Sequence, residues 1–97
     1  MKFEVSFHPK AYKEAQSLVK MNPDSGAKFR EYIELLSTKP YQFPKKYGKL
    51  KECRSCNFGV GGDSWRLVFI VLEDQNIVRI LAVGAHDKAY SSAQRRI

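Results

Sequence analysis

The chain has 97 residues, of which 43% are hydrophobic and 28% are charged, and this composition predicts one folded domain spanning residues 1–97. Such a composition excludes a disordered chain, and the length leaves no room for a second domain. The formal net charge is +7, which favours polyanionic partners such as nucleic acid, an acidic protein or a membrane surface. No apolar run approaches the roughly 20 residues of a membrane span. The start Met1-Lys2-Phe3-Glu4 carries charges where the apolar part of a secretion signal would lie, so we expect a cytoplasmic protein.

The first third of the chain predicts a strand followed by two helices. Residues 2–7 alternate between apolar and polar side chains, which is typical of a half-buried strand. Pro9 suits the first turn of a helix that runs to Met21, where Asn22-Pro23-Asp24 ends it. Asp24 or Ser25 can cap a second helix that reaches about residue 36. Two short amphipathic helices joined by a tight turn predict a helical hairpin.

The second half predicts three strands and a tail. Residues 37–47 form a loop with two prolines, and residues 50–58 are a weak strand candidate. Residues 64–72 and 77–83 are rich in apolar residues and predict two well-buried strands, separated by the polar turn 73–76. Residues 86–96 are polar and weakly helical. The expected fold is therefore α+β, with the order β-α-α-β-β-β and a short C-terminal helical tail, the helical hairpin packing on an antiparallel sheet.

Two stretches of the second half carry a family resemblance. They are Trp65-Arg66-Leu67-Val68-Phe69 and Ala82-Val83-Gly84-Ala85-His86-Asp87-Lys88-Ala89-Tyr90, with Leu50-Lys51-Glu52 as a vaguer third. Together with the element order, they resemble the RelE/ParE toxin superfamily. The resemblance implies a toxin of a type II toxin-antitoxin system that cuts messenger RNA on the ribosome and is neutralised by a cognate antitoxin in a hetero-oligomer. It implies no cofactor and no membrane partner.

Metal-free RNA cleavage requires a base for the 2′-hydroxyl, a cation for the phosphate and an acid for the leaving 5′-oxygen. Arg66 is the predicted phosphate clamp, because it interrupts an apolar run and its guanidinium matches phosphate oxygens in a bidentate way. His86 is the predicted general acid or base, because its reference pKa suits proton transfer near neutrality. Tyr90 can stack on a base or contact the phosphate if the tail is helical, and Glu52 could be the base. For each of these residues a purely structural role stays open.

Further basic residues are predicted to contact RNA phosphates: Lys45, Lys46, Lys49, Lys51, Arg54, Lys88, Arg95 and Arg96. Cys53 and Cys56 form a single CxxC, and on a strand they would face opposite sides, so no metal site is expected. Trp65 would point away from Arg66 into the core. Two alternatives stay open at this point: a ParE-like inhibitor of DNA gyrase without nuclease activity, and an RNA-binding module without chemistry.

Overall fold

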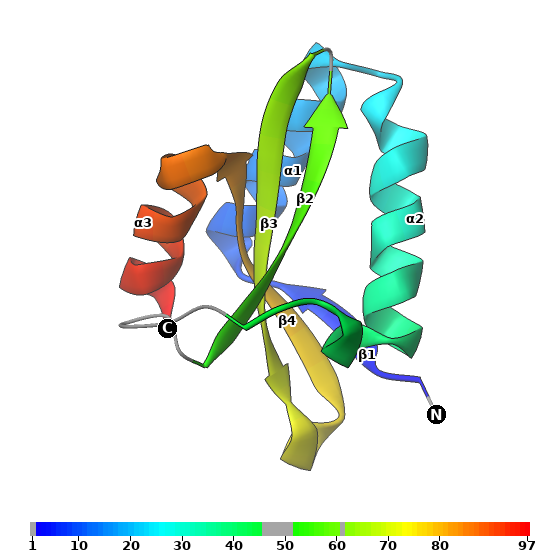
Figure 1. Cartoon of the computed structure of the whole chain (residues 1–97), viewed down its shortest axis with the longest axis vertical. Coiled ribbons are helices and arrows are strands. Elements are labelled where there is room, and N and C mark those ends of the chain that lie inside the picture. Colours follow the sequence, from blue (N-terminus) through cyan, green and yellow to red (C-terminus); the bar gives the residue numbers. More distant parts are fainter. Residues whose placement is uncertain (1, 46–51, 61) are drawn as a thin grey trace.

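The computed structural model describes residues 2–45, 52–60 and 62–97. The elements follow the predicted order (Figure 1): β1 (Glu4–Phe7), α1 (Pro9–Met21), α2 (Ser25–Thr38), the 3-10 turn η1 (Pro40–Gln42), β2 (Cys53–Val60), β3 (Asp63–Leu72), the 3-10 turn η3 (Glu73–Gln75), β4 (Ile77–Ala85) and α3 (His86–Arg96). Among the described helices, none is long and apolar enough to cross a membrane.

The four strands form one mixed sheet in the order β1-β4-β3-β2. The meander β2-β3-β4 is antiparallel, as predicted, but β1 pairs in parallel with β4. The chain direction explains this difference. α1 continues along β4 beyond the end of β1, α2 returns the chain, and β2 therefore starts from the same end of the sheet as β1. The two reversals of the meander then leave β4 parallel to β1.

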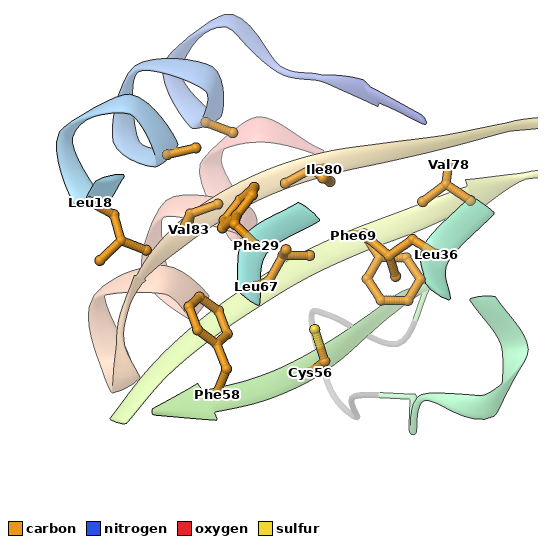
Figure 2. Packing of buried hydrophobic residues seen from close by; sticks show 12 residues of the cluster. Leu18, Phe29, Leu36, Cys56, Phe58, Leu67, Phe69, Val78, Ile80 and Val83 are labelled. Carbon is orange, nitrogen blue, oxygen red and sulfur yellow. The ribbon is translucent and has the colours of Figure 1, made fainter. Parts of the chain in front are cut away.

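Helices cover both faces of the sheet. The larger core cluster lies between the sheet and the hairpin of α1 and α2, where Leu18, Phe29 and Leu36 meet Leu67 and Phe69 (Figure 2). The smaller cluster lies under α3 and joins the helix residues Ala89 and Ala93 to Cys53, Val68, Leu81 and Ala82 of the strands. α2 and α3 therefore lie on opposite sides of the β2–β3 hairpin (Figure 1). The sheet is the middle layer of the molecule.

A β-bulge in β4 sets which side chains face α3. Val68 pairs with Ala82 and Phe69 pairs with Ile80, so Leu81 has no partner in β3. The extra residue reverses the alternation of β4, because Leu81 and Ala82 both pack on the α3 side. Val83 then returns to the larger cluster, and the next residue, Gly84, faces α3.

Candidate active site

The candidate site lies on the α3 face of the sheet, near the start of β3. Leu67 and Phe69 belong to the larger cluster, so strand alternation turns Arg66 to the face that carries α3. In the register of the sheet Arg66 lies opposite Asn57 of β2 and opposite Gly84 of β4. Trp65 packs against the larger cluster on the other face, as the alternation predicts.

The guanidinium of Arg66 makes few hydrogen bonds to the described residues. Its Nη1 lies 3.4 Å from Ser64 Oγ, a long hydrogen bond between residues on the same face of one strand. Its Nε is buried and has no hydrogen-bond partner among the residues that the structure describes. A buried donor without an acceptor costs about 1–3 kcal/mol, so this arrangement is expensive unless a ligand supplies the acceptor.

α3 brings Tyr90 over this arginine. The Cζ atom of Arg66 lies 6.0 Å from the centre of the Tyr90 ring, which is the range of a cation–π contact. Tyr90 is half-buried, and it packs against the smaller cluster. His86 is the first residue of α3, directly after β4, and its side chain lies outside the described residues. The structure thus brings Arg66 and Tyr90 together and places the backbone of His86 one helical turn before Tyr90.

Glu52 lies apart from this group. Asn57 is the β2 residue opposite Arg66, and Glu52 precedes it by five residues. At about 3.3 Å per residue, Glu52 is roughly 16 Å away along the strand. Its side chain is exposed. This separation argues against Glu52 as the base for a phosphate held by Arg66.

Arg54 serves the fold rather than this site. It lies on the same side of β2 as Cys56, which belongs to the larger cluster, and therefore on the opposite face from Arg66. Its Nη1 donates to the carbonyl of Phe43 at 2.7 Å and to the carbonyl of Tyr41 at 3.3 Å. Its Cζ lies 5.0 Å from the centre of the Tyr41 ring. These contacts fasten the segment around η1 to β2, so the predicted phosphate contact does not fit Arg54.

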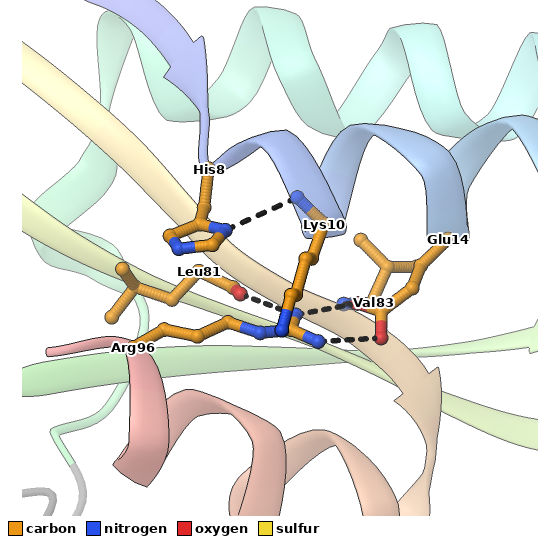
Figure 3. Close-up of polar contacts among 6 residues, drawn as sticks. All are labelled: His8, Lys10, Glu14, Leu81, Val83 and Arg96. Carbon is orange, nitrogen blue, oxygen red and sulfur yellow. Dashed lines mark hydrogen bonds and ion pairs between the residues drawn. The ribbon is translucent and has the colours of Figure 1, made fainter.

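Arg96 is likewise engaged inside the molecule. Its side chain is only 10% exposed and forms an ion pair with Glu14, with Nη1 and Oε1 2.8 Å apart (Figure 3). The remaining predicted phosphate contacts divide into two groups. Lys45, Lys88 and Arg95 are exposed, whereas Lys46, Lys49 and Lys51 lie outside the described residues.

The structure adds two residues that the sequence did not single out. Asn57 and Ser64 lie on the same face as Arg66, one across the sheet and one along the strand. Counting back two residues from Arg66 could have identified Ser64. Asn57 could be found only from the strand register, which depends on the turn between β2 and β3.

The two cysteines face opposite sides of the sheet. Cys53 belongs to the cluster under α3 and Cys56 to the larger cluster, as the strand alternation predicts. Both thiols are buried and free. Burial raises the pKa of Cys53 to about 11 and that of Cys56 to about 12, so neither is a ready nucleophile or metal ligand. In the described part of the chain, no three His, Cys, Asp or Glu side chains gather as a metal site would require.

The fold is shared with solved structures of known toxins. The chain superimposes on the free form of an arginine-substituted Escherichia coli toxin RelE with a TM-score of 0.78 at 21% identity, covering 100% of this chain and 99% of the other. It superimposes on one chain of the toxin-antitoxin complex RelBE2 of Mycobacterium tuberculosis with a TM-score of 0.72 at 23% identity, covering 89% of this chain and 100% of that one. Identities this low establish a shared fold only. The architecture is that of these RelE structures.

Sequence comparison then establishes the family. The family model described as "ParE toxin of type II toxin-antitoxin system, parDE" matches residues 5–90. The protein named "Putative toxin RelE1" of Methanocaldococcus jannaschii is 30% identical over 94 residues, which are 95% of this chain and 99% of that protein. The chain belongs to the ParE toxin family, within the RelE/ParE superfamily of type II toxin-antitoxin systems.

Proposed function

We propose that this toxin cleaves messenger RNA on the ribosome, by attack of the 2′-hydroxyl on the adjacent phosphorus, in a reaction that uses no metal ion. The observation that carries the proposal is the Arg66 guanidinium, which lies beneath Tyr90 and whose buried Nε has no acceptor among the described residues. An internal donor of this kind is costly, and a phosphate oxygen is the acceptor that an arginine fork matches best. The products are a 2′,3′-cyclic phosphate and a free 5′-hydroxyl.

Each group has a distinct part in this reaction. Arg66 binds the phosphate and stabilises the negative charge that grows on it in the transition state. His86, at the start of α3, exchanges protons with the 2′-oxygen or with the leaving 5′-oxygen. Tyr90 orients the nucleotide by stacking or by donating a hydrogen bond. The exposed Lys45, Lys88 and Arg95 attract the RNA backbone without reading its sequence.

A second candidate function is inhibition of DNA gyrase without nuclease activity. Two observations favour it. The matching family is that of the ParE toxins. In addition, the β2 residue opposite Arg66 is the neutral Asn57, and the acidic Glu52 is remote. Cleavage needs a base near the phosphate, and the described residues of β2 place no carboxylate beside Arg66. This arrangement is compatible with binding that involves no cleavage.

A cognate antitoxin is the expected protein partner of either function. The structural neighbours include an E. coli toxin RelE in complex with an antitoxin RelBc peptide, with a TM-score of 0.66 at 24% identity. The net charge of +7 favours a partner with acidic segments. We propose a toxin-antitoxin hetero-oligomer in the cytoplasm, in which the antitoxin covers the basic surface.

Translation in a cell-free extract tests the proposal directly. The purified chain is compared with Arg66→Ala and His86→Ala, and the message is mapped by primer extension. Cuts within codons that appear only on ribosome-engaged message, and that both substitutions abolish, are the expected result. An intact message together with blocked DNA supercoiling in a parallel gyrase assay would favour the second candidate. An intact message with active gyrase would leave a binding module without chemistry.

A further inference from the structure

The outer edge of β4 extends past the strand that covers it. β1 pairs with β4 only as far as Phe7, which lies opposite Ile80, and the His8 amide then donates to the Ile80 carbonyl at 2.8 Å. From Leu81 onward no described strand lies on this side of β4. The edge groups beyond this point need other partners, because an unpaired backbone group is costly when it is buried.

Two side chains from distant parts of the sequence supply these partners (Figure 3). Glu14 of α1 accepts a hydrogen bond from the Val83 amide at 3.1 Å. Arg96 of α3 donates to the Leu81 carbonyl at 2.9 Å. The two side chains also form a two-pronged ion pair, with Nη1–Oε1 at 2.8 Å and Nη2–Oε2 at 3.1 Å. Only 10% of the Arg96 side chain and 25% of the Glu14 side chain are exposed.

The strand edge fixes which partner must be the acid. The Val83 amide can only donate, so the residue on α1 has to accept. The Leu81 carbonyl can only accept, so the residue on α3 has to donate. Exchanging the two side chains would keep the ion pair but would set donor against donor at Val83 and acceptor against acceptor at Leu81. This dependence on the backbone distinguishes the arrangement from an ordinary surface salt bridge.

The ion pair holds the C-terminal end of α3, which is the end farthest along the chain from the junction with β4. α3 begins directly after β4, so its first turn is fixed by the chain, whereas Arg96 is its last residue. Between these ends the helix buries small side chains, namely Ala89, Ser92 and Ala93, which interlock less deeply than large ones. Tyr90 lies on this helix, so its place over Arg66 depends on how the helix is held.

We propose that Glu14 and Arg96 are positioning residues, which clamp α3 to the open edge of β4 and thereby hold Tyr90 against Arg66. The inference rests on the proposed nuclease function for its effect on catalysis, but the clamp itself can be tested without that function. Neither residue touches the RNA in this proposal.

The test compares Arg96→Lys, Glu14→Gln and the exchanged double variant Glu14→Arg/Arg96→Glu with the natural chain. Ser37→Ala is the matched control, since it removes a 2.9 Å hydrogen bond to the Phe3 carbonyl at a site remote from α3. All assays are made well below the lowest melting temperature of the set. Glu14→Gln preserves the side-chain shape and is the variant that tests the clamp if Arg96→Lys does not fold.

The expected result has three parts. The single-turnover cleavage rate at saturating programmed ribosomes falls by about tenfold in Arg96→Lys, while the concentration for half-maximal rate changes less than about twofold, because orientation is lost rather than affinity. The exchanged variant does not recover the rate. Hydrogen exchange of the α3 amides becomes faster in the clamp variants but not in Ser37→Ala, which also cleaves normally.

Two results would overturn the proposal. One is a folded Arg96→Lys with natural cleavage and natural exchange in α3. The other is recovery in the exchanged variant, which would reduce the contact to a simple charge attraction. If the natural chain cleaves no message, the proposed function fails, and the exchange pattern of α3 alone still decides whether the clamp exists.

Discussion

Arg54 and Arg66 lie on neighbouring strands, and replacing each by methionine should have opposite consequences. Methionine keeps most of the length of the side-chain stem but removes every donor. Arg54 fastens the segment around η1 through its bonds to the Phe43 and Tyr41 carbonyls, at 2.7 and 3.3 Å. Among the described residues, Arg66 has a long hydrogen bond to Ser64 and a contact with the Tyr90 ring, and its buried Nε has no acceptor. The first arginine should therefore matter for folding, and the second for the reaction.

The magnitudes follow from these contacts. Hydrogen bonds from a charged group contribute about 1.5–3 kcal/mol when buried, and the partial exposure of Arg54 reduces this to about 1–2 kcal/mol. In a chain of this size, such a loss lowers the melting temperature by roughly 5–10 °C. Arg66→Met removes a buried donor that has no acceptor among the described residues, so stability should stay within about 0.5 kcal/mol of the natural chain or rise slightly. Cleavage should fall about 10²–10³-fold, as expected for the loss of a transition-state donor.

Thermal unfolding followed by circular dichroism measures the melting temperature of each variant. Single-turnover cleavage, at a temperature where both variants are folded, measures the reaction rate. Arg54→Met should be less stable and nearly as active as the natural chain. A marked drop in the melting temperature of Arg66→Met would show that Arg66 is a structural residue. An inactive but fully stable Arg54→Met would place the site on the other face of the sheet. Either outcome would refute the assignment.

Two further predictions concern titratable groups, namely two buried thiols and one partly buried carboxylate. Burial raises the pKa of the Cys53 thiol to about 11 and that of the Cys56 thiol to about 12. Both thiols should therefore react with iodoacetamide at pH 8 only after unfolding. Modification at the same rate in native and denatured protein would contradict their burial. For Glu14, burial raises the pKa, but the hydrogen bonds from Arg96 and Val83 and nearby positive charge outweigh it, so the folded pKa lies below its ordinary value of 4.5. The ionised carboxylate therefore adds stability above that value, which is lost as the pH falls through the folded pKa. The difference in unfolding free energy between the natural chain and Glu14→Gln should accordingly shrink in acid, and a difference that is constant from pH 7 to pH 3 would show that the charge of Glu14 contributes nothing.

Local sequence patterns were sufficient for the elements themselves. Pro9 and the apolar stripe of the first helix located α1, and the alternation around Arg66 correctly separated it from Trp65. These features depend on neighbours within a few residues, which is the range over which periodicity carries information. The predicted cap of α2 was confirmed in position only. Asp24 occupies the N-cap position without a side-chain hydrogen bond, and Ser25 Oγ donates to the Asn22 carbonyl at 2.6 Å.

Features that depend on distant pairing could not be predicted in this way. The parallel placement of β1 follows from the path of the whole chain, and the bulge at Leu81 follows from the register of β3 against β4. The clamp joins residues 82 positions apart, so no local pattern contains it. The distance of Glu52 from Arg66 likewise became visible only when the strands were in register.

The contacts of three arginines show why the net charge overestimates the number of side chains available to bind phosphate. Arg54, Arg66 and Arg96 contribute equally to the formal charge, yet two of them give their donors to backbone carbonyls of the same chain. Arg96 is further neutralised by Glu14. A donor that the fold already satisfies gains little from a phosphate, because binding would only exchange one acceptor for another. An unsatisfied donor gains the full bond, and Arg66 has the buried guanidine nitrogen for which the described residues offer no acceptor. Among these three arginines, the hydrogen bonds of the described residues therefore favour Arg66 as the proposed phosphate-binding residue.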